Sequence, residues 1–320
     1  MGATPSAAGS PSTGAASPAA GSPTARAGSP TPGGPTNTPA PVPTPTQARS
    51  KLAVPATDSA ITASDVTFPG QGTTVMAYLA RPGGTGAAGP TAAASPMATA
   101  KPAATAVAGA TPGAASKVEP PYRAVLVCHE NRGLTEHIKD VTRRLAKAGY
   151  VALAVDLLSR DGGTAKVDPA QVPGKLGNPE QHVSDFQAGL RHLQSQSFVD
   201  RNKIGMVGFC FGGGITWLMA VNAPELKAAV PFYGPPPPAA DIAKIRAAVL
   251  AIYAGNDARI NAGSPAFEEA LKKAGVKYTI RMHDGAEHGF MNDTGQRYDK
   301  GAAEIAWVWT VGFLAETLKS

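Results

Sequence analysis

The sequence predicts an α/β fold with a mostly parallel central sheet and helices on both of its faces. Two observations predict it. Short apolar segments rich in β-branched residues alternate along the chain with longer segments of helical periodicity, and several of the apolar segments are continuous. Continuous apolar strands are typical of parallel sheets, because crossover helices bury both faces of such a sheet.

The elements begin with a hairpin. Residues 60–68 and 73–80 carry β-formers on either side of a Pro-Gly-Gln-Gly turn, so they are expected to pair antiparallel at the sheet edge. Polar loops follow the later strands at the edge where open α/β sheets bind ligands. Those strands are expected at 123–128, 151–155, 204–207, 228–232, 248–253 and 278–282, with helices at 134–148, 179–196, 215–221, 265–274 and 301–318.

Composition divides the 320 residues unevenly. Residues 1–54 consist mainly of Ala, Gly, Pro, Ser and Thr, which offer too little bulky apolar surface to offset the entropy of ordering, so a disordered tether is expected. A similar low-complexity insert at about 83–117 interrupts the folded part between two strands. The rest of residues 55–320 has the size of one α/β domain.

Charge and hydropathy restrict the partners. The formal net charge is +6, yet Lys and Arg are scattered among acidic residues, without the basic patch of a nucleic-acid surface. The sequence shows neither a membrane-spanning apolar stretch nor a signal h-region. Since such tethers are typical of exported proteins, a secreted or surface-tethered location after signal removal is expected over a cytoplasmic one. We expect a monomer that acts on a small molecule.

The segment 203–214 (KIGMVGFCFGGG) combines an apolar strand, a cysteine flanked by glycines and the start of a helix. This is the nucleophile elbow G-x-S-x-G with Cys210 in the serine position. The helix would direct unpaired backbone N–H groups at a developing oxyanion and would lower the pKa of a thiol there. The alternative is that Cys210 is a small core residue. A dinucleotide site is not predicted, because the G-x-G-x-x-G spacing is absent.

A nucleophilic thiol needs a base, and the base needs an orienting carboxylate. Asp257 and His288 follow later strands in the order nucleophile, acid, histidine, so they are the candidates. Taken singly, Asp257 could be a helix-cap aspartate and His288 a surface histidine. All three in the right order favour a triad.

Two competing uses of these residues are less well supported. The histidines and acids at 283–288 do not have the spacing of an HExxH helix or a zinc site, so no metal is expected. A redox pair of Cys210 with Cys128 would need two strand ends within disulfide range. We interpret both cysteines as free thiols, and Cys128 as a buried core residue.

The motifs around Cys210, Asp257 and His288 resemble those of the dienelactone hydrolase family, which has the α/β-hydrolase fold. The quoted segments are Gly208-Phe209-Cys210-Phe211-Gly212-Gly213, Gly255-Asn256-Asp257 and Glu287-His288-Gly289-Phe290, and the resemblance covers about 60–82 and 118–318.

The resemblance implies roles for further residues. Glu130 would contact the resting thiol and help to release it as thiolate, the amides of Asn131 and Phe211 would form the oxyanion hole, and Arg160 would hold a substrate carboxylate. A salt-bridged surface pair is the alternative for Glu130 and Arg160. The chain departs from the family at Asn292, where the archetypal enzymes have a second arginine. Arg132 is a conjectural substitute for that arginine in binding a substrate carboxylate.

The predicted reaction is therefore hydrolysis of an ester or lactone through a thioester on Cys210, without a cofactor. Because Asn292 weakens the case for an anionic dienelactone, a general carboxylesterase acting on neutral esters stays open. A surface-tethered binding protein without turnover is a further alternative.

Overall fold

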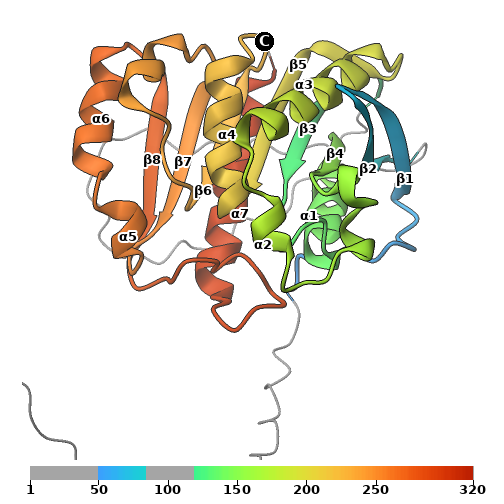
Figure 1. Cartoon of the computed structure of the whole chain (residues 1–320), viewed down its shortest axis with the longest axis horizontal. Helices are drawn as coiled ribbons and strands as arrows, with labels where there is room; N and C mark the ends of the chain where they lie inside the picture. The colour runs from blue at the N-terminus through green and yellow to red at the C-terminus, as the bar shows by residue number, and fades with distance from the viewer. Residues whose placement is uncertain (1–49, 84–118, 320) are drawn as a thin grey trace, which may run out of the picture. The chain divides into compact units, whose positions relative to one another are not determined.

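The eight strands of the chain form a single sheet in the order β1-β2-β4-β3-β5-β6-β7-β8 (Figure 1). The computed structural model describes residues 50–83 and 119–319. The β1–β2 and β2–β4 pairs are antiparallel, and every other neighbouring pair is parallel. The strands are β1 Ile61–Gly70, β2 Thr73–Pro82, β3 Tyr122–Cys128, β4 Val151–Asp156, β5 Val199–Phe209, β6 Ala228–Phe232, β7 Ala248–Ala254 and β8 Tyr278–His283. The predicted fold class is confirmed.

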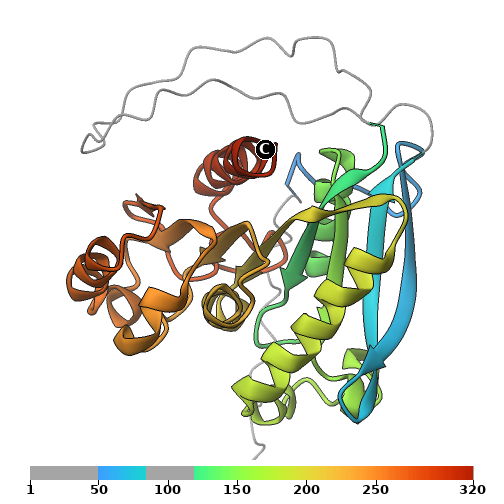
Figure 2. The same ribbon diagram turned by 90° about the horizontal axis from the view of Figure 1, so that it is seen from above.

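Helices cover both faces of this sheet, and Figure 2 shows α1 and α7 on one face with α3, α4 and α6 on the other. The helices are α1 Glu136–Lys147, α2 Val172–Lys175, α3 Pro179–Ser195, α4 Phe211–Asn222, α5 Ala258–Asn261, α6 Ser264–Lys273 and α7 Lys300–Thr317. Two cores result. In β4, Val151, Leu153 and Val155 belong to the core under α3 and α4, whereas Ala152 and Ala154 belong to the core under α1 and α7.

The predicted elements differ from the structure mainly where polar residues hide a strand or where a helix is very short. β5 begins at Val199, before the predicted 204, and its first half includes half-buried Asp200 and the exposed residues Arg201 and Asn202. No apolar pattern marks such a segment. The four-residue helices α2 and α5 are also absent from the prediction, because one turn is too short to show a period.

The N-terminal boundary of the domain needs a correction. We expected a disordered tether up to residue 54, but Ser50 and Val54 are buried. The Val54 N–H donates to Asp140 Oδ1 at 2.6 Å, and Arg143 Nε donates to the Val54 carbonyl at 2.6 Å. Hydrogen bonds with the backbone of this segment hold it on α1, and such bonds are not evident from amino-acid composition. The expected tether at 1–49 and most of the insert, 84–118, lie outside the described residues.

A buried ionic cluster joins this segment to the loop before α7. The Ser50 N–H donates to Asp293 Oδ2 at 3.1 Å, and His137 Nδ1 lies 3.0 Å from Asp293 Oδ1. Arg144 bridges Asp140 at 2.5 Å and Asp293 at 2.8 Å. Burial by itself raises the pKa of Asp293, but the His137 hydrogen bond and the Arg144 charge outweigh it and hold that pKa well below its usual range.

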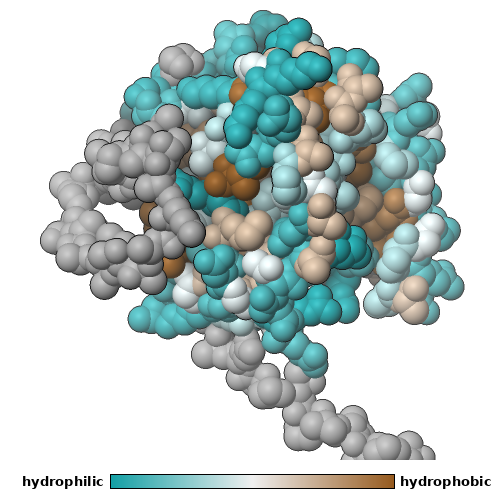
Figure 3. All heavy atoms as spheres, turned by 90° about the vertical axis from the view of Figure 1, so that its left-hand side faces the viewer, coloured by the Kyte–Doolittle hydropathy of each residue, from teal (hydrophilic) through white to brown (hydrophobic). Residues whose placement is uncertain are grey.

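The surface on the side of α6 and β8 is mostly hydrophilic, with apolar groups in separate small patches (Figure 3). Among the described residues, the large hydrophobic side chains that are exposed are Met76, Met282, Ile305 and Val308. Within residues 50–83 and 119–319, none of the helices has the length and hydropathy to cross a bilayer.

Removing one member of the Asp293 cluster should destabilise the protein strongly. Asp293→Asn leaves the Arg144 charge buried with one partner fewer, so we expect the free energy of unfolding to fall by about 3–5 kcal/mol in urea titrations. Asp65→Asn is the matched control: this carboxylate pairs with Lys139 at 3.3 Å, but its side chain is 78% exposed, so the expected loss is below about 1 kcal/mol. Equal losses in the two variants would contradict the role given to the cluster.

Candidate active site

Cys210 lies on a sharp turn between β5 and α4. Its φ is 58°, in the left-handed region that non-glycine residues rarely adopt, and its N–H donates to the Phe232 carbonyl at 3.0 Å. Backbone strain of this kind persists only where the surroundings enforce it. The predicted strand, turn and helix are thus present, and the thiol stands at the carboxyl edge of the sheet.

Two glycines permit this turn because other backbone lies against them. A Cβ built on Gly212 would lie 2.4 Å from the His129 carbonyl oxygen, and one on Gly208 would lie 2.2 Å from the Gly212 carbonyl oxygen. Neither neighbour is a flexible side chain. The first turn of α4 therefore packs directly on the backbone after β3, where Glu130 and Asn131 follow.

The thiol environment combines opposing effects. Burial raises the pKa of Cys210, and the negative charge of Glu130 raises it further. The backbone N–H groups of Phe211 and Asn131, together with the Arg259 charge, lower that pKa, but the net shift is upward. The two amides expected at an oxyanion hole thus both act on the sulfur, and the resting group is a protonated thiol.

Glu130 is held by the residue that departs from the family pattern. Asn292 Nδ2 donates to Glu130 Oε2 at 2.5 Å. Asn292 therefore supplies a neutral amide to a carboxylate that faces the thiol. Asn292 directly precedes Asp293, so the contacts of Asp293 with Arg144 and His137 also hold the loop that carries Asn292.

His288 and Asp257 meet after β8 and β7. His288 Nδ1 lies 2.5 Å from Asp257 Oδ2, and Asp257 is buried. The other carboxylate oxygen accepts the Ile260 N–H at 3.4 Å, which makes Asp257 the N-cap of α5 as well. One carboxylate therefore both caps α5 and contacts His288.

Tyr233 is a site residue that the sequence analysis missed. It directly follows β6, has a φ of 36° and is fully buried, with its ring 4.9 Å from that of His288. Within the described residues its hydroxyl forms no regular hydrogen bond, although the Met291 backbone N–H acts on it and lowers its pKa. Burial, then the charges of Glu130 and Cys210, raise the pKa of this phenol well above its usual value. The signal for it was its place in Phe-Tyr-Gly, immediately after a buried strand.

Arg160 and Arg132, which were predicted to bind substrate, have different surroundings. Arg160 forms an ion pair with the buried carboxylate of Asp185 and donates to the Gln71 carbonyl at 3.0 Å. Arg160 is thus ion-paired with a buried carboxylate and not with Glu130. Arg132 is exposed. The cation that lowers the pKa of the thiol is Arg259, which the sequence analysis did not single out.

The other candidate chemistry receives no added support. Within the residues that the structure describes, no group of three His, Cys, Asp or Glu side chains could hold a metal ion. Both cysteines are free, and Cys128 is fully buried, which raises the pKa of its thiol.

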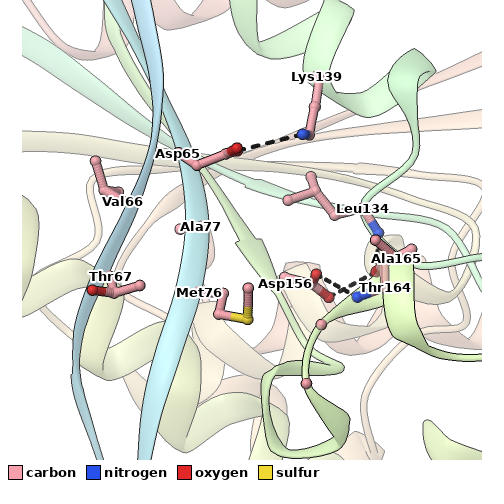
Figure 4. Close-up of a pocket in the computed structure, with 12 residues that line it drawn as sticks. Asp65, Val66, Thr67, Met76, Ala77, Leu134, Lys139, Asp156, Thr164 and Ala165 are labelled. Atoms are coloured by element: carbon pink, nitrogen blue, oxygen red, sulfur yellow. Dashed lines mark hydrogen bonds and ion pairs between the residues drawn. The ribbon is translucent and has the colours of Figure 1, made fainter.

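A hollow of about 310 Å³ opens between the β1–β2 hairpin, α1 and the loop after β4 (Figure 4). None of the predicted site residues lines it. Its wall includes a brace, because the Thr164 hydroxyl donates to Asp156 Oδ1 at 2.8 Å and accepts the Leu134 N–H at 2.8 Å. The brace ties the loop that carries Asn131 to the loop that carries Arg160.

The parallel sheet, the strained turn after β5 and the loops after β7 and β8 define the class as an α/β hydrolase. The family model described as "Dienelactone hydrolase family" matches residues 111–318. The chain belongs to the dienelactone hydrolase family and is a hydrolase.

Individual relatives agree with this. The chain is 32% identical over 266 residues to a protein of Escherichia coli (strain K12) named "Putative carboxymethylenebutenolidase", with 78% of this chain and 85% of the relative covered. It is 33% identical over 240 residues to a protein of the same name from Saccharolobus solfataricus, and the match covers 63% of this chain and 92% of the relative. The solved structure of a protein from Klebsiella pneumoniae, named "Putative Dienelactone Hydrolase", superposes with a TM-score of 0.65 at 27% identity. The match covers 80% of this chain and 99% of that one.

The thiol should ionise only at high pH. Because burial and Glu130 raise the pKa of Cys210 above its ordinary value, the rate of alkylation by iodoacetamide should rise with pH with a midpoint above that of an unperturbed cysteine. Glu130→Gln removes a negative charge and should move the midpoint downward. Glu225→Gln, an exposed carboxylate beyond the far end of α4, should leave it unchanged. An unchanged or higher midpoint in Glu130→Gln would contradict this electrostatic account.

The close backbone approach at the elbow gives a second expectation. Gly212→Ala places a Cβ against the His129 carbonyl and should lower the free energy of unfolding by about 1–3 kcal/mol or more. Gly312→Ala lies inside α7 with open space around the added atom and should raise it by about 0.5–1 kcal/mol. Thermal and urea unfolding of both variants test this, and a neutral Gly212→Ala would count against the tight approach.

Proposed function

We propose that the chain hydrolyses carboxylic esters or lactones through a thioester on Cys210, with His288 as base and Asp257 as its orienting acid. The observation that carries the proposal is the thiol on the strained turn, where the amides of Phe211 and Asn131 lower its pKa. Groups that favour a negative sulfur also favour the oxyanion that develops beside it. The His288–Asp257 contact supplies the second half of the machinery.

In the proposed reaction, His288 takes the proton of the Cys210 thiol, the sulfur attacks the acyl carbon, and the carbonyl oxygen becomes an oxyanion held by the two amides. The C–O bond to the alcohol then breaks, and protonated His288 gives the alcohol its proton. Water next loses a proton to His288 and attacks the thioester, which releases the acid and restores the thiol. In a lactone the alcohol and the acid are parts of one product.

Glu130 has a place in this sequence because the resting thiol is protonated. Its carboxylate raises the pKa of Cys210 while Asn292 holds it in place. If substrate displaces Glu130 from the sulfur, or if Glu130 takes up a proton, that effect disappears and the thiolate becomes easier to form. Activation of the nucleophile would then depend on bound substrate.

The alternatives predict different substrates. A general carboxylesterase would favour neutral esters, and Asn292 in place of a family arginine supports it. A tethered binding protein would need neither the base nor its carboxylate. The secreted or surface-tethered location, the monomeric state and the tether itself remain proposals from the sequence.

Hydrolysis of p-nitrophenyl acetate and of a cis-dienelactone by wild type, Cys210→Ala and Cys128→Ala tests the proposal. Cys210→Ala removes the nucleophile and should lower kcat/KM at least about a thousandfold, while Cys128→Ala, which changes the buried thiol, should retain activity in the folded protein. Turnover of the neutral ester alone would favour the general esterase. Turnover that survives in Cys210→Ala would overturn the assignment of the nucleophile.

A further inference from the structure

Arg259 is an exposed cation on the loop side of the predicted site. It is the second residue of α5, two positions after Asp257, whose carboxylate contacts His288. Figure 1 shows α5 at the edge of the sheet where β7 and β8 end and α4 begins. Among residues 50–83 and 119–319, no carboxylate forms an ion pair with it. Within this described part of the chain its guanidinium donates no hydrogen bond either, so its donors are available to a ligand.

The Asp257–His288 contact places α5, and with it Arg259, beside the predicted base, and the charge of Arg259 also lowers the pKa of Cys210. The arginine expected in this role is engaged elsewhere, because Arg160 is paired with buried Asp185. Two charges of opposite sign thus act on the sulfur. The Glu130 carboxylate follows β3 and raises the pKa of the thiol, whereas the Arg259 cation lies in α5 and lowers it.

We propose that Arg259 is the specificity-determining residue of the site and binds the anionic group of a substrate whose carboxylate lies close to the scissile acyl carbon. The inference rests on the proposed hydrolysis at Cys210. Arginine binds carboxylates through two parallel hydrogen bonds, and an unpaired guanidinium loses no existing ion pair when it does so. Glu130 repels the same anion, which places it on the Arg259 side of the thiol. A neutral ester would leave Arg259 without a partner.

Alkylation of Cys210 tests the cation independently of hydrolysis. Iodoacetate and iodoacetamide both lose iodide when the sulfur attacks their methylene carbon, but only iodoacetate carries a carboxylate. The ratio of their rates is insensitive to the fraction of thiolate, because both reagents depend on it equally. Fully buried Cys128 is shielded, and Cys210→Ala measures any background.

The iodoacetate-to-iodoacetamide ratio should fall about threefold to tenfold in Arg259→Gln. Arg259→Lys keeps the charge and should retain most of the ratio. Arg246→Gln is the matched control: this exposed arginine precedes β7 at its opposite end, roughly 20 Å away, and should change nothing. An unchanged ratio in Arg259→Gln, or a fall in Arg160→Gln instead, would overturn the proposal.

Hydrolysis then tests the specificity role. In Arg259→Gln, kcat/KM for p-nitrophenyl hemisuccinate, whose acyl part is anionic, should fall about tenfold relative to kcat/KM for p-nitrophenyl acetate, mainly through KM, because a change in the pKa of Cys210 affects both esters equally. Equal losses on the two esters would overturn the role of Arg259. Loss of Cys210 dependence would instead overturn the proposed hydrolysis, and the alkylation ratio would still report on Arg259.

Discussion

The close approach of three backbone segments at the turn after β5 is the constraint on which the site depends. Gly212 lies against the backbone that follows β3, and a Cβ on Gly213 would lie 2.4 Å from the carbonyl oxygen of Phe232 at the end of β6. Because β3, β5 and β6 are neighbours in the sheet, this contact places Glu130, Cys210 and Tyr233 side by side at its edge. A larger residue at either glycine would separate them.

A second chain of contacts fixes the same edge from the opposite face. Asn292 holds Glu130, and the adjacent Asp293 is held by Arg144, His137 and the backbone of Ser50. The carboxylate that controls the thiol is thus joined to a buried ionic cluster and through it to the start of the folded domain. Such clusters add little net stability by themselves, but removing one member leaves a buried charge uncompensated. Their geometry is for that reason sharply defined.

The sequence predicts what short-range patterns encode. Alternating apolar strands and helices predict the parallel sheet, and the glycines around Cys210 predict the strained turn. Contacts between distant residues leave no such pattern. Asp185 forms an ion pair with Arg160 from a separate helix. Tyr233 has a positive φ, which a tyrosine in the sequence does not predict. Arg259 was overlooked because a family motif drew attention to other arginines, and Ser50 because composition describes side chains and not backbone hydrogen bonds.

The charges around Cys210 determine whether an anionic substrate can bind beside a thiol that must ionise in the proposed reaction. A substrate carboxylate on Arg259 cancels part of the field that lowers the pKa of the sulfur, so binding alone makes ionisation harder. The opposing term is Glu130. In the proposed reaction, the thiol proton passes to His288, and the negative sulfur faces two backbone amides. Repulsion between the substrate anion and Glu130 favours displacement or protonation of Glu130, which removes the charge that raises the pKa of the sulfur. In this mechanism, Glu130 and Arg259 thus couple the substrate's charge to the formation of the nucleophile.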